Sequence, residues 1–167
     1  SIRRQRQMCI RDRDKPLFTP GPLTTSATVK EAMLRDLGSR DGEFIGVVKK
    51  IRERLLKLAG VSQSQGWETV LMQGSGTFAI ESVISSITPP EGKWLVIING
   101  DYGERLLKII ERHGFAVDAM RNAENELPNV GSIKLTMAKG GFTHVAVVHC
   151  ETTSGIMNPI AEIGTVV

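Results

Sequence analysis

The strongest constraint on the fold is an alternation of short apolar runs with helical patterns between residues 67 and 150. Strand-length apolar runs occur at 67–72, 93–99, 115–120 and 144–150, and a helical segment follows each of the first three. Parallel strands need a crossover connection, which is usually a helix. The alternation therefore predicts an α/β fold with a buried, mostly parallel sheet and helices on both faces.

Helix boundaries are predicted from caps and spacing. Residues 28–38 and 43–60 show helical periodicity, with Asp41 as an N-cap and Gly60 as the residue after the second helix. We interpret the basic residues of 43–60 as a solvated face rather than a phosphate-binding one. Further helices are predicted at 78–87, 101–114 and 130–141. Asp101 and Glu104 have capping-box spacing, and Gly114 is the expected stop.

The formal net charge of +3 is concentrated at the amino terminus. Residues 1–15 carry six basic and two acidic side chains, so the rest of the chain is close to neutral. We expect residues 1–16 to form a poorly ordered basic segment and residues 17–167 to form an incomplete major domain. A targeting remnant or a phosphate-binding arm is the alternative for the basic segment. The charge distribution does not favour a nucleic-acid partner.

The sequence lacks both a membrane-length apolar run and a paired cysteine spacing. The longest apolar runs, such as 94–98, are much shorter than the roughly 20 residues of a membrane-spanning helix, so we expect no membrane role. Cys9 and Cys150 lack the spacing of a metal site or a disulfide framework. We therefore expect no metal and a reducing compartment, the cytoplasm, with the mitochondrion as an alternative.

Three polar turns are predicted at the carboxyl ends of strands, where ligands collect in such sheets. They are residues 74–77, 99–103 and 151–155. In the first, Gly76 lets backbone N–H groups approach an anion, and Ser75 and Thr77 add hydroxyl groups at a helix N-terminus. This turn is interpreted as a phosphate site, and simple helix capping is the alternative. Its spacing matches neither the dinucleotide nor the nucleoside-triphosphate motif.

The other two turns add a ring and hydroxyl groups. Tyr102 is the only tyrosine and can stack on a planar ligand, or merely cover the start of a helix. Thr152, Thr153 and Ser154 offer hydrogen bonds to a ligand, although such residues are also common in ordinary turns.

Four segments together carry a family resemblance: "LFTPGPLTTSATVKEAML", "QGSGTFAIES", "INGDYGERL" and "HCETTSGIMNPI". In this order and at these separations they resemble the class V aminotransferases of the pyridoxal-phosphate fold type I group. The "GTFAIES" and "NGDYGERL" motifs are most similar to those of the 2-aminoethylphosphonate–pyruvate transaminases. The resemblance runs from about Leu17 to Val167 and implies part of a fold type I large domain.

The resemblance also implies roles. Ser75, Gly76 and Thr77 would hold the phosphate of pyridoxal 5′-phosphate, Tyr102 would stack on its ring, and Thr152 or Thr153 would bond near its 3′ oxygen. The loop formed by Thr19, Pro20, Gly21 and Pro22 would lie near the substrate. The family's Schiff-base lysine, the aspartate that pairs with the pyridinium nitrogen and the substrate-binding arginine are all expected beyond Val167. We therefore expect this chain to be inactive by itself.

The implied reaction belongs to phosphonate catabolism: 2-aminoethylphosphonate gives its amino group to pyruvate, and the complete protein is a homodimer. Two alternatives remain open. The first is an alanine–glyoxylate-type class V transaminase, which would share the fold and the cofactor. The second is a non-catalytic truncated subunit that pairs with a longer chain.

Overall fold

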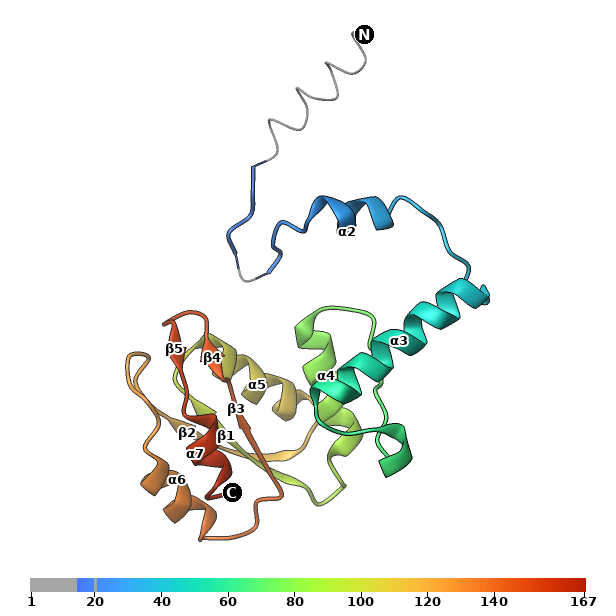
Figure 1. Cartoon of the computed structure of the whole chain (residues 1–167). Coiled ribbons are helices and arrows are strands. Elements are labelled where there is room, and N and C mark those ends of the chain that lie inside the picture. Colours follow the sequence, from blue (N-terminus) through green and yellow to red (C-terminus); the bar gives the residue numbers. More distant parts are fainter. Residues whose placement is uncertain (1–14, 20) are drawn as a thin grey trace. The chain divides into compact units, whose positions relative to one another are not determined.

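The computed structural model describes residues 15–19 and 21–167 (Figure 1). The described chain divides into two compact units, one ending at Leu71 and the other comprising Met72–Val167. The predicted basic segment 1–16 lies outside the described residues except for Lys15 and Pro16. The predicted division into segments 1–16 and 17–167 therefore stays a prediction.

The first unit is helical over its described residues. It contains α2 (Ala27–Ala32), α3 (Gly42–Leu58) and the 3-10 turn η1 (Gln63–Gln65). The helix predicted at 28–38 ends early, at Ala32, and the apolar residues that follow are not buried: Met33 and Leu34 are 77% and 85% exposed. Gly60 follows α3 with a φ of 72°, as predicted for a helix C-terminus.

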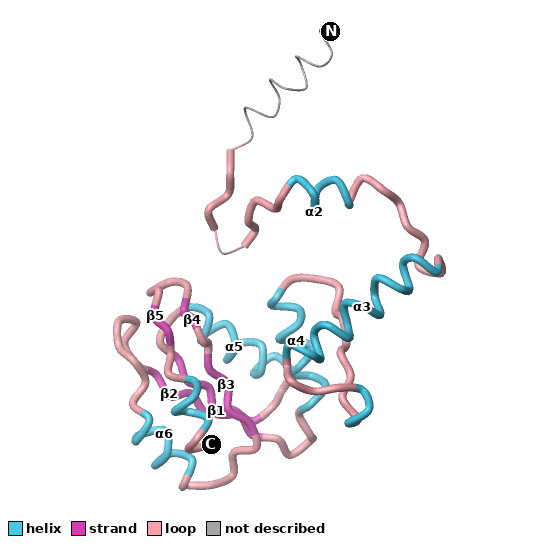
Figure 2. The backbone as a smooth tube through the Cα atoms, viewed as in Figure 1, coloured by secondary structure: helices cyan, strands magenta, loops and turns pink. Residues whose placement is uncertain are grey.

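The second unit holds the sheet. Three parallel strands, β1 (Lys93–Ile98), β2 (Ala116–Arg121) and β3 (His144–Val147), pair in the order β2-β1-β3. The helices are α4 (Gly76–Ile87), α5 (Asp101–Arg112), α6 (Val130–Met137) and α7 (Ile160–Gly164). A short antiparallel ribbon follows β3, formed by β4 (Cys150–Glu151) and β5 (Ile156–Met157) (Figure 2).

The core lies on both faces of β1, because successive side chains of a strand point to opposite sides. Trp94, Val96 and Ile98 pack on one face with apolar residues of α4 and α5. Ile97 packs on the other face with Ile133 of α6 and Ile163 of α7. Figure 1 shows α5 and α7 on opposite sides of the strands. The predicted fold class, a mostly parallel sheet with helices on both faces, is confirmed.

Two strand predictions need correction. Residues 67–72 form no strand. A strand needs a neighbouring strand to receive its hydrogen bonds, and no described strand pairs with this run, in which Val70 is 77% exposed. The run 144–150 is not one strand either, because β3 ends at Val147 and Cys150 begins the antiparallel ribbon.

No helix among the described residues has both the length and the apolar character needed to cross a membrane.

Candidate functional site

The turn at residues 74–77 begins α4. Ser75 is the N-cap, and its Oγ accepts a hydrogen bond from the backbone N–H of Phe78 at 3.2 Å. Gly74 has a φ of 144°, and a Cβ there would lie 2.8 Å from Phe78 Cδ1, so the chain's own conformation requires this glycine. A Cβ on Gly76, by contrast, would meet no atom within 4 Å. Internal packing does not require a glycine there, and the open space suits close approach by a ligand.

The turn at residues 99–103 follows β1 and begins α5. The predicted cap is wrong: Gly100 occupies the N-cap position, and Asp101 is exposed in the first helical turn. The first backbone N–H groups of a helix have no partner within the helix and must find one elsewhere. In α5 the partner is the side chain of Glu151, which comes from β4.

Glu151 is completely buried, with 0% of its surface exposed. Its Oε1 accepts hydrogen bonds from the backbone N–H of Tyr102 at 3.3 Å and from the hydroxyl of Thr153 at 3.0 Å. Its Oε2 accepts from the backbone N–H of Gly103 at 3.2 Å. The sequence prediction missed this residue, although an acid at the end of one strand and a helix N-terminus at the end of the next is a usable signal.

Arg105 joins the first two turns. Its guanidinium carbon lies 4.7 Å from the centre of the Tyr102 ring, and its Nη1 donates to the Thr77 hydroxyl at 3.5 Å. Tyr102 itself is 39% exposed, so part of its ring is open to a ligand. The three turns predicted from the sequence are thus connected: Arg105 links 74–77 to 99–103, and Glu151 links 99–103 to 151–155.

One part of the edge-of-sheet prediction is wrong. The second and third turns lie beyond the carboxyl ends of β1 and β3, as expected. The first turn follows no strand, because residues 67–72 are irregular. Its predicted phosphate role rests on the N-terminus of α4, not on a strand end.

A pair of buried asparagines lies at the same edge. Asn99 Nδ2 donates to Asn158 Oδ1 at 2.8 Å, and Asn158 Nδ2 donates back to Asn99 Oδ1 at 3.0 Å. Asn99 Nδ2 also donates to the carbonyl of Glu126 at 3.1 Å, and Asn158 Nδ2 to that of Val148 at 2.7 Å. The pair ties the end of β1 to the segment before α7 and fixes where the second turn starts.

The threonines of the third turn differ in their partners. Thr152 and Thr153 are both exposed and lie between β4 and β5. The Thr153 hydroxyl proton is used in the bond to Glu151, which leaves only lone pairs for a ligand.

The predicted substrate loop belongs to the first unit. Thr19, Gly21 and Pro22 are exposed, and the Thr19 hydroxyl donates to the carbonyl of Pro22. Pro20 lies outside the described residues. The predicted substrate role of this loop stays a prediction.

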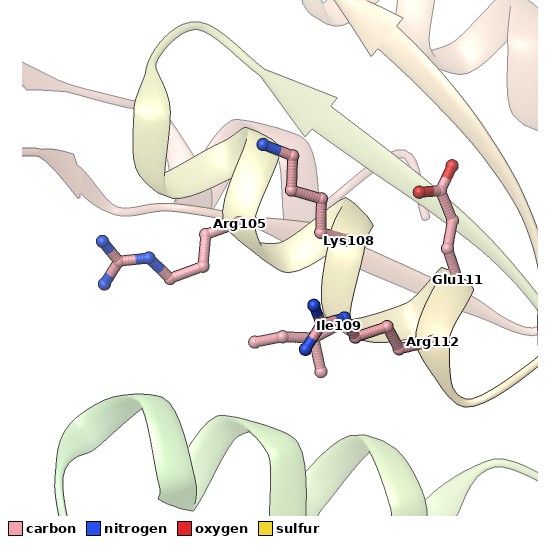
Figure 3. Close-up of a pocket in the computed structure, with 5 residues that line it drawn as sticks. All are labelled: Arg105, Lys108, Ile109, Glu111 and Arg112. Atoms are coloured by element: carbon pink, nitrogen blue, oxygen red, sulfur yellow. The ribbon is translucent and has the colours of Figure 1, made fainter.

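A basic surface on α5 adjoins Arg105. A pocket of about 440 Å³ is lined by Arg105, Lys108, Ile109, Glu111 and Arg112, all from this helix (Figure 3). Glu104, on the same helix, accepts a bond from Arg121 Nε at 2.7 Å. The hydrogen bond from Arg121 lowers the pKa of Glu104, and the same bond raises the pKa of Arg121. This ion pair ties the first turns of α5 to the end of β2.

Two histidines and one cysteine of the described residues have the following surroundings. His144 stacks on Trp94 with ring centroids 4.5 Å apart, and His113 lies 3.2 Å from a carboxylate oxygen of Glu81. Cys150 is a free, exposed thiol, and Cys9 lies outside the described residues. Within residues 15–19 and 21–167, no three His, Cys, Asp or Glu side chains are grouped so as to hold a metal ion.

The chain is similar to curated proteins over most of its length. It is 49% identical over 149 residues to the 2-aminoethylphosphonate–pyruvate transaminase of Bacillus cytotoxicus, which covers 88% of this chain and 40% of that protein. It is 44% identical over 152 residues to the Rhizobium meliloti protein of the same name, covering 90% of this chain and 39% of that protein. The chain thus spans about two fifths of these relatives' length. No family model matches.

The fold is also similar to that of a solved aminotransferase structure. The crystal structure of ureidoglycine–glyoxylate aminotransferase from Bacillus subtilis superposes with a TM-score of 0.79 at 28% identity, covering 92% of this chain and 40% of that one. The resemblance predicted from the four sequence segments is confirmed.

Proposed function

We propose, on the premise that this chain has the sequence and fold of part of a class V aminotransferase, that the whole protein is a 2-aminoethylphosphonate–pyruvate transaminase dependent on pyridoxal 5′-phosphate. It would convert 2-aminoethylphosphonate to phosphonoacetaldehyde and pyruvate to alanine. The observation that carries the proposal is the identity of 44–49% to proteins of that name across about nine tenths of the chain.

The donor set fits the cofactor. Pyridoxal phosphate combines a dianionic phosphate with a flat aromatic ring, and when bound it supplies the electron sink that such amino transfers need. The N-terminus of α4 offers backbone N–H groups that have no partner within the helix, open space over Gly76 and the hydroxyls of Ser75 and Thr77 for the phosphate. The half-open ring of Tyr102 offers a stacking face.

Arg105 would organise both parts of this site. Its charge lies between the Tyr102 ring and the Thr77 hydroxyl, so it would attract the phosphate while keeping the aromatic ring in place. Thr152 is the better donor to the 3′ oxygen, because the Thr153 proton is already bonded to Glu151.

We further propose that the lysine and the aspartate required by the chemistry come from outside these 167 residues. Lys93 lies at the amino end of β1, away from the predicted site, where it pairs with Asp118 at 2.7 Å. Lys134 and Lys139 are exposed on and just after α6. On this proposal, the 167 residues alone would show no turnover with either substrate pair.

The test is a coupled assay for alanine with the complete protein. We expect alanine from pyruvate plus 2-aminoethylphosphonate, and little transfer from alanine to glyoxylate. The reverse preference would favour an alanine–glyoxylate transaminase, and no transfer from any donor would refute the proposal.

Variants of Tyr102 test the site itself. Tyr102→Phe keeps the ring and should bind pyridoxal phosphate nearly as well as the unaltered protein, whereas Tyr102→Ala should bind about tenfold more weakly through loss of stacking. Equal affinity of the two variants would remove Tyr102 from the site.

A second copy of the complete chain is the proposed partner. Three apolar residues that share one side of α4 support it, since Ile80, Val83 and Ile87 are 40%, 53% and 52% exposed. Light scattering of the complete protein should give twice the mass of one chain.

A further inference from the structure

The carboxyl group of Glu151 is the only one among the described residues that is fully buried. Burying a carboxyl group is costly unless its oxygens accept hydrogen bonds, and Glu151 accepts three, from two separate turns. Two of these bonds come from the backbone of Tyr102 and Gly103, and the third comes from Thr153.

We infer that Glu151 is a positioning residue: it holds the Tyr102 turn and the Thr153 turn in one fixed arrangement, so that ring and hydroxyl groups meet the same ligand. This inference rests on the proposed function for what the ligand is. The anchoring itself rests only on the observed hydrogen bonds.

Gly100 supports this role. Its φ of 169° is extended backbone that any residue adopts, so conformation does not explain the glycine. A Cβ at this position would lie 2.3 Å from Glu151 Cγ, 2.4 Å from Glu151 Cδ and 2.8 Å from Thr153 Oγ1. The missing side chain of Gly100 therefore provides the space that the Glu151 carboxyl group occupies.

The Glu151 carboxyl group caps the first turn of α5, which carries Tyr102. The first backbone N–H groups of α5 would otherwise turn to water, and the first turn of a helix frays readily without a cap. Tyr102 is the second residue of α5, so its ring direction depends on that turn being closed. Asp101, the nearest alternative cap in the sequence, is exposed at the helix start.

The experiment uses the complete protein and three variants. Glu151→Gln keeps the size of the side chain but turns one acceptor into a donor, which must face an N–H group or the Thr153 hydroxyl. Gly100→Ala pushes the carboxyl group away without changing it. Glu124→Gln is the matched control, because Glu124 is an exposed carboxylate on the loop after β2.

Hydrogen exchange without cofactor gives the first readout. We expect the amides of Tyr102 and Gly103 to exchange about tenfold faster in Glu151→Gln and Gly100→Ala, with β1 and β3 unchanged. Unchanged exchange at these two amides would overturn the inference. Faster exchange throughout the sheet would also overturn it, because it would assign Glu151 to general stability.

Cofactor binding gives the second readout. We expect the dissociation constant for pyridoxal phosphate to rise about tenfold in both variants, with an altered circular dichroism band of the bound cofactor, and no change in Glu124→Gln. Unaltered affinity and band shape with faster exchange would restrict Glu151 to a structural role and overturn the positioning. If the unaltered protein did not bind pyridoxal phosphate, the proposed function would fall, and the exchange result would alone decide whether Glu151 fixes the two turns.

Discussion

Replacing Asn99 by alanine should loosen the edge of the sheet that carries the candidate site. Asn99 is 1% exposed and Asn158 is 3% exposed, so neither amide has water to replace a lost partner. Asn99→Ala removes three hydrogen bonds: two between the paired amides and one to the carbonyl of Glu126. It also leaves the Asn158 amide oxygen and the Glu126 carbonyl without these donors.

The magnitude follows from the number of bonds. Each buried hydrogen bond contributes about 1 kcal/mol net, and stranded polar groups add to the loss, so we expect a cost of about 3 kcal/mol. That free energy corresponds to a change of about a hundredfold in an opening equilibrium.

Hydrogen exchange of β1 in the complete protein is the assay, because Trp94–Ile97 lie between two strands and open only with the sheet. We expect these amides to exchange about a hundredfold faster in Asn99→Ala. Asn125→Ala, on an exposed turn, is the matched control and should change little. A change below about threefold in Asn99→Ala would refute the argument from buried amides. Strict additivity of Asn99→Ala and Asn158→Ala would refute the pairing itself.

Three further changes test the surroundings of the site. Ser75→Ala removes the cap on the N–H of Phe78 and should destabilise α4 by about 1 kcal/mol, measured by exchange of the amides of that helix. Ile133→Ala opens a cavity beside β1 and should cost about 2–5 kcal/mol, measured by urea unfolding. Glu104→Gln tests the ion pair with Arg121: the hydrogen bond from Arg121 lowers the pKa of Glu104, so the pair stabilises the fold above the ordinary carboxyl pKa of 4.5 and ceases to do so as pH falls through the lowered value. The unaltered protein should therefore melt slightly above Glu104→Gln at pH 7, and the two should converge once the pH falls below the lowered pKa of Glu104.

Periodicity and capping residues predict the elements whose signal lies in residues close together in the sequence. β1 was recognisable because Trp94–Ile98 is a continuous apolar run, which is typical of a strand buried on both faces. Gly60 and Gly114 marked helix ends correctly, since both have a positive φ that favours glycine. These features depend on residues that are neighbours in the sequence, so they can be predicted from the sequence alone.

The predictions that were wrong concern features decided by residues distant in the sequence. Residues 67–72 have the composition of a strand, but a strand exists only where another backbone pairs with it, and composition does not show the partner. Asp101 has the spacing of a cap, but Glu151 takes its place from β4, 48 residues beyond Gly103. In both cases a distant part of the chain decides the local structure.

The candidate site divides in the same way. The sequence suggests Ser75, Tyr102 and Thr153 as candidates because each lies in a polar turn next to a helix or strand end. The residues that connect the turns were not, because their partners are distant: Arg105 reaches Thr77, and Glu151 reaches Tyr102. Local pattern predicts candidate ligand-binding groups, while long-range packing sets the distances between them.

This edge of the sheet differs from the apolar core because it buries polar side chains. Asn99, Glu151 and Asn158 are the buried polar side chains of the described residues, and all three lie at the carboxyl edge of β1 and β3. Apolar residues of similar size would avoid the desolvation cost of these groups. Hydrogen bonds, however, fix direction as well as distance, and apolar packing does not. Polar burial at this edge therefore favours a defined arrangement of turns over maximal stability, which is the property that a site made from separate turns requires.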